Sequence, residues 1–381
     1  MSKRTLAYLA GHWLSAHCKK VCAAAACVFA GHAALAQSVV FINPGKVDEA
    51  YWVAAAESMQ KAADSLGMDL RTIYTHRNRL EPIAIAQQLA SLPPKERPDY
   101  VVFSNEYNVA SSVLRELDGS GIKVMMAFSG SQSQSSDPIG QPREIYKFWL
   151  GSLESNAEVA GYLTAKALID AAKKKSPAWR QQGKLQMLAI AGDRSTPSSI
   201  ARNKGMHKAI EESAGQVELL QEVYGEWRTD KAQVQAEVLF KRYPQTQIVW
   251  SGNDLMAFGA MQALRSKGGQ PGKDVLFSGI NTSREAFDKL RSGQLTALAG
   301  GHFLAGAWAL VMLYDYHRGI DFLDEGLEVK RPMFVLFDER SSAQFEKRFT
   351  DKGAKLDFRR YSKHLNPDVT AYDFDLAKLL P

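Results

Sequence analysis

The side chains that carry out covalent chemistry in enzymes are present in this chain, but not at the spacings that such chemistry requires. Five histidines lie beyond residue 36, and no two of them have the helical spacing of a metal-binding pair. The sequence contains neither a Gly-x-Gly-x-x-Gly fingerprint nor a phosphate loop ending in Gly-Lys-Ser/Thr. It also lacks the Gly-x-Ser-x-Gly elbow that presents a nucleophilic serine. These searches favour a binding protein over an enzyme, with no cofactor and no metal.

Composition and charge exclude further classes of protein. The 381 residues are 45% hydrophobic and 23% charged, which is typical of a globular chain. The formal net charge of +6 falls to +2 without the first 36 residues, because that segment holds four basic residues and no acid. Nucleic acid is therefore not expected as a partner. All three cysteines, Cys18, Cys22 and Cys27, lie in the same segment, so the rest of the chain cannot form a disulfide or a thiolate site.

The first 36 residues have the pattern of a secretory signal peptide. A basic start and an apolar run from Val21 to Ala30 precede Ala34-Leu35-Ala36, the small-x-small pattern that signal peptidase recognises. The apolar run is shorter than the roughly 20 residues that span a bilayer. We therefore expect cleavage after Ala36 and a periplasmic protein. Lipidation at Cys27, which follows three alanines, is the minor alternative.

Beyond this segment, short apolar strands alternate with helices. Residues Ser38–Asn43 form an apolar run that ends at Pro44-Gly45, and helical spacing follows over Tyr51–Leu66. The alternation continues to Arg284–Ser292, interrupted by a polar stretch over Ser129–Arg143. Strands that alternate with crossover helices form parallel sheets. We predict an α/β fold of two doubly wound parallel-sheet lobes.

Polar and aromatic residues follow many of the predicted strands. In doubly wound sheets, ligands bind beyond the carboxyl ends of the strands. The loops that this rule selects are Asn43–Trp52, Ser104–Glu106, Ser129–Gly130, Asp193–Arg202, Gly225–Arg228, Ser251–Asp254 and Asn281–Ser283.

Three segments resemble a known family. Residues Val47–Trp52 place an aromatic pair at the start of a helix, and Ser199–His207 contains Arg-Asn-Lys-Gly after a proline-capped turn. The most specific segment is Asn-Asp-Leu-Met-Ala-Phe-Gly at 253–259, followed by Gly-Ile-Asn at 279–281. This segment resembles the Asn-Asp-x-Met-Ala-x-Gly and Gly-x-Asp motifs of type I periplasmic binding proteins of the ribose/galactose-binding family. The resemblance extends from about Ser38 to Phe337.

The resemblance implies two lobes joined by a three-segment hinge that closes on a ligand. It implies an N-terminal lobe of residues 37–129 plus 303–335 and a C-terminal lobe of residues 151–301 plus 336–381. Residues 130–150 are then the linker and first crossing. The tail after Asp338 is longer than a minimal member of the family needs.

The resemblance also implies a set of ligand-binding residues. Aromatic walls suit the apolar faces of a sugar ring, while arginine and asparagine supply donors and acceptors for its hydroxyls. Several of these residues also have structural interpretations: the tryptophans as core residues, Asn253 as a helix cap and His302 as a hinge residue. The full set of predicted ligand contacts is Tyr51, Trp52, Asn105, Ser129, Arg202, Trp227, Asn253, Asn281 and His302.

The sequence departs from the family at two positions. Asn281 stands where sugar binders usually have aspartate, and Ala127-Phe128-Ser129 lacks the usual charged pair. Two carboxylates that would accept hydroxyl groups are therefore missing. Glu106 and Asp48 are the candidates to replace them.

We predict a monomeric, exported solute-binding protein that closes on a small polar, sugar-like ligand and delivers it to an ABC-transporter permease. Within the same fold, the alternative is a sensing receptor similar to the autoinducer-2 receptors, which would dock on a membrane sensor kinase or cyclase. The alternative from another class is a secreted α/β enzyme with an unrecognised site.

Overall fold

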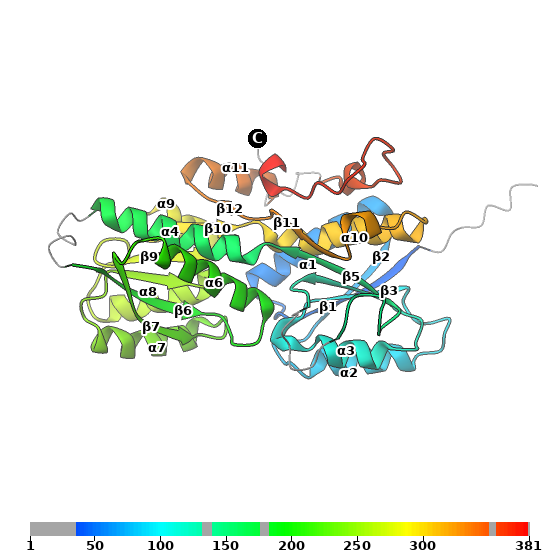
Figure 1. Ribbon diagram of the computed structural model, residues 1–381, viewed down its shortest axis with the longest axis horizontal. Helices are drawn as coiled ribbons and strands as arrows, with labels where there is room; N and C mark the ends of the chain where they lie inside the picture. The colour runs from blue at the N-terminus through cyan, green and yellow to red at the C-terminus, as the bar shows by residue number, and fades with distance from the viewer. Residues whose placement is uncertain (1–35, 132–138, 176–182, 350–355, 380–381) are drawn as a thin grey trace, which may run out of the picture. The chain divides into compact units, whose positions relative to one another are not determined.

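The computed structural model describes residues 36–131, 139–175, 183–349 and 356–379 (Figure 1). The predicted signal peptide therefore lies outside the described residues, apart from Ala36. Residues from Gln37 onward form one compact unit. Among the described helices, none is both long and apolar enough to cross a membrane.

The N-terminal lobe is built on a six-stranded parallel sheet with the order β11-β5-β4-β3-β1-β2. Helices α1 and α10 pack on one face of the sheet, and α2 and α3 pack on the other. Each strand sends alternate side chains to the two faces, so that both faces are buried. The elements are β1 (Ser38–Asn43), α1 (Ala50–Leu66), β2 (Asp69–Tyr74), α2 (Glu81–Ser91), β3 (Tyr100–Phe103), α3 (Ala110–Leu117), β4 (Lys123–Phe128), β5 (Trp149–Ser155), α10 (Ala305–His317) and β11 (Glu328–Arg331).

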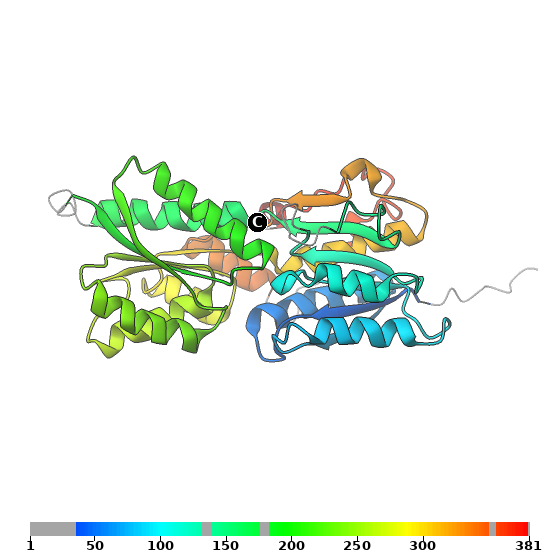
Figure 2. The same ribbon diagram turned by 60° about the horizontal axis from the view of Figure 1, so that its bottom comes forward.

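The C-terminal lobe repeats this plan, as Figure 2 shows with the two lobes next to each other. Its strand order is β12-β10-β9-β8-β6-β7, in which only β12 is antiparallel to its neighbour. Helices α4 and α6 cover one face, and α7, α8 and α9 cover the other. The elements are α4 (Ala157–Lys175), β6 (Leu185–Ala191), α6 (Pro197–Glu211), β7 (Val217–Tyr224), α7 (Thr229–Arg242), β8 (Ile248–Ser251), α8 (Asp254–Ser266), β9 (Leu276–Ile280), α9 (Arg284–Arg291), β10 (Ala297–Gly300) and β12 (Val335–Leu336). The predicted pair of doubly wound lobes is confirmed.

The chain passes between the lobes at three segments: residues 155–157, 300–305 and 331–335. The first crossing differs from the prediction, which placed it within residues 130–150. Strand β5 belongs to the N-terminal sheet, where Leu153 pairs with Ala127 of β4. The polar stretch after β4 therefore returns the chain to the same lobe instead of leading out of it.

The tail after Asp338 also departs from the prediction, which assigned all of it to the C-terminal lobe. Helix α11 (Glu339–Phe349) does pack there, with the Phe345 ring 5.5 Å from that of Phe287 on α9. Residues 356–379, however, pack on the N-terminal lobe. The Phe374 ring stacks on Trp308 of α10 at 5.2 Å, a long-range aromatic contact that no local pattern reveals.

Helices α4 and α6 cross with their backbones in direct contact. A Cβ atom at Gly205 would lie 1.9 Å from the carbonyl oxygen of Glu158, and one at Gly161 would lie 1.9 Å from that of Arg202. Both positions therefore require glycine for the close approach. This contact fixes the helix that carries Arg202.

We expect Gly205→Ala to lower the free energy of unfolding. Alanine is the better helix former by about 1 kcal/mol, but the clash with α4 requires the helices to separate, and overpacking costs about 1–3 kcal/mol or more. Urea unfolding measures the net effect. The exposed Glu211→Ala on the same helix should change the free energy by less than about 0.5 kcal/mol. A neutral or stabilising Gly205→Ala would show that the two helices have room to separate.

Candidate functional site

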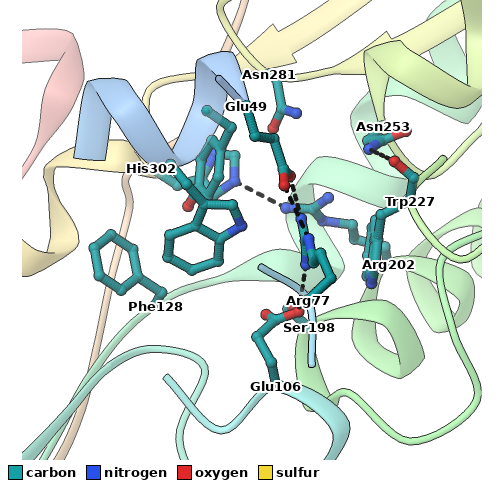
Figure 3. Close-up of a pocket in the computed structure, with 12 residues that line it drawn as sticks. Glu49, Arg77, Glu106, Phe128, Ser198, Arg202, Trp227, Asn253, Asn281 and His302 are labelled. Atoms are coloured by element: carbon teal, nitrogen blue, oxygen red, sulfur yellow. Dashed lines mark hydrogen bonds and ion pairs between the residues drawn. The ribbon is translucent and has the colours of Figure 1, made fainter. Parts of the chain in front are cut away.

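Side chains from both lobes and from the second hinge crossing converge on one small pocket (Figure 3). Its cavity volume is only about 30 Å³, so the cleft is closed in this structure. Two hydrogen bonds join the lobes beside it: Tyr107 N donates to Thr196 Oγ1 at 3.0 Å, and Ser198 N donates to Ser129 Oγ at 3.2 Å. The lining residues are Glu49, Tyr51, Trp52, Arg77, Glu106, Phe128, Ser198, Arg202, Trp227, Asn253, Asn281 and His302.

A tryptophan from each lobe forms a wall of the pocket, and each is seated against a glycine. Trp52 lies in the first turn of α1, where a Cβ atom at Gly45 would come within 2.3 Å of its ring. Trp227 follows β7 in the left-handed region at φ 62°, and its indole packs equally closely over Gly192. The Trp227 Nε1 donates to Asp193 Oδ2 at 2.8 Å, which fixes the ring plane.

Arg202 extends from α6 into the pocket and is 5% exposed. Its Nη1 donates to the Gly252 carbonyl at 2.7 Å, and its Nη2 lies 2.9 Å from His302 Nε2. Burial lowers the pKa of Arg202, yet the group remains a cation because an arginine pKa lies so far above neutrality. Within the described part of the chain, Arg202 forms no salt bridge.

His302 lies at the second hinge crossing and lines the pocket. Its ring stacks between those of Tyr51, at 4.6 Å, and Phe334, at 4.5 Å. Burial, reinforced by the Arg202 cation, holds the pKa of His302 well below its usual value, so the ring is neutral. Because Arg202 can only donate, His302 Nε2 accepts, and the ring proton resides on Nδ1.

The N-terminal lobe contributes a cluster of Glu49, Arg77 and Glu106, in which Glu106 is buried and the other two are partly buried. Arg77 Nε donates to Glu49 Oε2 at 3.0 Å, and Arg77 Nη1 donates to Glu106 Oε2 at 3.2 Å. Burial raises the pKa of Glu106 to about 7, although the Arg77 cation opposes this shift. Of the two candidates for the missing carboxylates, Glu106 lines the pocket, whereas Asp48 is exposed and does not line it.

Two of the three predicted asparagines, Asn253 and Asn281, line the pocket, and they differ in how their side chains are held. Asn253 Oδ1 accepts from Met256 N at 2.9 Å and caps α8, which leaves only its amide nitrogen, 3.4 Å from the Trp227 carbonyl. Asn281 Nδ2 donates to Asp254 Oδ1 at 2.9 Å, and this bond orients the amide. The amide oxygen of Asn281 is therefore the acceptor that remains for a ligand, at the position where sugar binders usually carry a carboxylate.

Seven of the predicted residues line this pocket, whereas Asn105 and Ser129 do not. Asn105 holds its own loop, because its Nδ2 donates to the Gly130 carbonyl at 2.8 Å and its Oδ1 accepts from Ala110 N. Ser129 makes the bond between the lobes described above. For both residues, the predicted ligand contact is replaced by a structural role.

Arg77 and Phe128 also line the pocket, although neither is among the predicted contacts. Arg77 follows β2, and the rule that ligands bind beyond strand ends also selects the loop after this strand. Phe128, the last residue of β4, had been noted only for the absence of a charged pair. Glu49 and Ser198 lay within the selected loops but were not singled out.

Three buried donors of the pocket have no hydrogen-bond partner among the described residues: Trp52 Nε1, Arg202 Nε and His302 Nδ1. Buried polar groups are usually paired, and leaving one unpaired costs about 1–3 kcal/mol. All three belong to residues that line the pocket, and unpaired donors there suit a ligand rich in oxygen acceptors. Among the described residues, no cluster of three His, Cys, Asp or Glu side chains could hold a metal ion.

The raised pKa of Glu106 predicts a pH-dependent stability. A carboxyl group whose folded pKa exceeds its unfolded value of 4.5 stabilises the fold fully below pH 4.5, and this stabilisation is lost as the pH rises through about 7. Lowering the pH from 8 to 5 should therefore stabilise the native protein relative to Glu106→Gln by roughly 1–3 kcal/mol. Thermal unfolding across this range measures the difference. Glu96→Gln, an exposed control, should show no such trend, and a constant offset for Glu106→Gln would contradict the prediction.

Comparison with known proteins places this fold and pocket in one family. The model of the periplasmic binding protein domain matches residues 39–321 of this chain. The crystal structure of a periplasmic sugar-binding protein from Pseudomonas fluorescens is 38% identical, with a TM-score of 0.80 over 90% of this chain and 99% of that one. A solute-binding protein from Actinobacillus succinogenes with bound D-allose shares the fold, at 16% identity and a TM-score of 0.67 over 81% of this chain and 99% of that one.

Among curated proteins, the D-allose-binding periplasmic protein of Escherichia coli K12 is 30% identical over 134 residues. This alignment covers 35% of the present chain and 42% of that relative, which is less than half of either. The family match spans most of the chain and agrees with the lobes, the three crossings and the closed pocket. The chain therefore belongs to the periplasmic binding protein domain family and has the two-lobed type I fold.

Proposed function

We propose that this protein binds a neutral monosaccharide or a related polyol in the pocket between its lobes. The observation that carries the proposal is the combination of two glycine-seated tryptophan walls with three unpartnered buried donors. The apolar faces of a sugar ring pack on aromatic walls, and its ring of hydroxyl groups requires both donors and acceptors. Glu106 and the amide oxygen of Asn281 supply the acceptors.

The charges of the pocket favour a neutral ligand. Arg77 and Arg202 contribute two positive charges, while Glu49 and Glu106 contribute two negative charges when Glu106 is ionised. Arg77 is already neutralised by its own lobe through Glu49 and Glu106. A charged ligand would leave an uncompensated charge in a closed cleft, which is costly.

The relatives support a sugar as the ligand class. The Pseudomonas fluorescens relative is described as sugar-binding, and the Escherichia coli relative as D-allose-binding. By analogy, the closed protein would act as a monomer that delivers its sugar to an ABC-transporter permease in the membrane. Lobes joined by three crossings suit this role, because hinge closure buries the ligand and opening releases it.

Arg202→Ala is expected to abolish sugar binding without unfolding the protein. In a thermal-shift screen of pentoses, hexoses, 6-deoxyhexoses and inositols, a ligand at 100 times its Kd stabilises the native protein by about 2.7 kcal/mol. The variant loses the unpartnered Nε donor and the buried guanidinium that Gly252 and His302 orient in the pocket. It should lose at least about 100-fold in affinity, or ~2.7 kcal/mol.

The matched control is Arg194→Ala, an exposed arginine near the start of α6 that does not line the pocket. It should retain the affinity of the native protein. If Arg202→Ala binds the sugar as tightly as the native protein does, the ligand lies elsewhere. If no compound of the panel raises the melting temperature of the native protein, a sugar is not its ligand.

The exported protein is expected to begin at Gln37. The body of the fold starts at this residue, which is 4% exposed and donates through Nε2 to the Leu313 carbonyl at 3.0 Å. Intact mass measurement of the protein from the periplasm tests the cleavage after Ala36. A mass that includes residues 1–36, or a lipid attached to Cys27, would contradict it.

A further inference from the structure

We propose that the end of the chain is a clamp on the hinge that restricts how far the lobes open when no ligand is bound. The clamp consists of residues 372–379, the last described segment, which includes the short helix η5 (Leu376–Leu379). It lies outside residues 39–321, which match the family, and the proposed sugar site does not use it. The proposal does not depend on the identity of the ligand.

The tail is anchored on the N-terminal lobe by a buried carboxylate. Asp315 of α10 is 0% exposed and accepts four hydrogen bonds from the tail. Ser362 Oγ and Tyr372 Oη donate to it at 2.5 and 2.8 Å, and the backbone N–H groups of Lys363 and His364 donate at 2.8 and 3.2 Å. A buried carboxylate satisfied by four donors holds its partners firmly, because losing any of them leaves a charge underpaired.

A second carboxylate reinforces this anchor. Glu325 accepts from Lys363 Nζ at 2.8 Å and from the Tyr372 backbone N–H at 2.9 Å, and it also pairs with Arg331. Arg331 Nε in turn donates to the Tyr372 carbonyl at 3.0 Å. Since Arg331 begins the third hinge crossing, the anchor reaches the hinge itself.

The same tail is attached to the C-terminal lobe through α11. The Phe345 ring lies 5.5 Å from Phe287 and 5.2 Å from Phe337, and it also contacts Phe303 of the second crossing at 5.8 Å. Figure 1 shows α11 over the C-terminal lobe and the red segment running over α10 of the N-terminal lobe. The tail is thus attached to both moving bodies.

Between these two attachments, Leu376 packs against two hinge crossings at once. A Cβ atom at Gly301 would lie 1.8 Å from Leu376 Cδ2 and 2.9 Å from the Met333 carbonyl, so the three residues are in contact. The Leu376 N–H lies 3.4 Å from the Pro332 carbonyl, and the side chain is fully buried. In Figure 1 the red segment that includes η5 lies where the two lobes meet.

This placement determines the direction of the effect. Leu376 fills the space beside the second and third crossings. We infer that the crossings rotate when the lobes part at the pocket, and that this rotation compresses the side chains packed against them. A well-packed core resists compression. Leu376 therefore opposes wide opening, and its removal should increase the opening of the ligand-free protein.

The test measures the distance between the lobes with spin labels. The mature chain contains no cysteine, so Gln87→Cys on α2 and Val238→Cys on α7 give two specific labelling sites, both exposed and both distant from the tail in Figure 1. Pulsed electron resonance on the ligand-free protein gives the distance distribution. We expect a narrow distribution for the native tail, and a longer and broader one for Leu376→Ala and for a chain shortened by residues 376–381.

Leu365→Ala is the matched control, because this leucine belongs to the same tail but is 40% exposed. Its distribution should equal that of the native tail. A distribution for Leu376→Ala that is unchanged or shorter overturns the proposal. Circular dichroism verifies that each variant is folded. If the shortened chain does not fold, the distance distribution of Leu376→Ala tests the proposal by itself.

If sugar binding is established, a tenfold loss of the closed population should weaken the apparent affinity tenfold. The distance measurement needs no ligand. The proposal of the clamp and the proposal of the sugar site can therefore be disproved independently of each other.

Discussion

A buried guanidinium that pairs with no carboxylate of the described residues is the constraint on which the rest of this site depends. Arg202 is held by a carbonyl oxygen and by a neutral histidine, neither of which cancels its charge. The arrangement is stable only if the supporting helix is rigid and the histidine keeps its proton on Nδ1. The glycine contacts between α4 and α6 provide the rigidity, and burial of His302 at the hinge keeps it neutral. Glu106, close to its titration point, offsets the charge across the cleft.

Much of the fold could be predicted because its signals are local. Apolar runs that end in turn residues predict the strands. Proline or glycine at the ends of helical patterns predicts the helices between them. Strand β5 was missed because the long polar stretch before it resembles a linker, and only the pairing of Leu153 with Ala127 returns the chain to the first sheet. The path of the tail is set by contacts such as Phe374 on Trp308, which join residues 66 positions apart and leave no periodic pattern.

The site was predictable to the extent that strand ends determine it. Trp52, Arg202 and Trp227 follow strands, and the fold brings them into one pocket. Whether a polar side chain in such a loop faces a ligand depends on what else it can bond. Asn105 and Asn253 use their amides to hold their own loops or helices, whereas Asn281 is turned by Asp254 so that its oxygen remains available. Tertiary contacts determine which of these side chains stays available to a ligand. The order of residues along one loop does not specify those contacts.

The position of His302 links selectivity to kinetics. Its ring is a wall of the pocket and at the same time part of a crossing about which the lobes rotate. A substitution that reshapes this wall for a different ligand also alters the stiffness of the crossing. Ligand preference and the speed of release are therefore not separately adjustable at this residue, and natural or engineered variants that change one property will change the other with it.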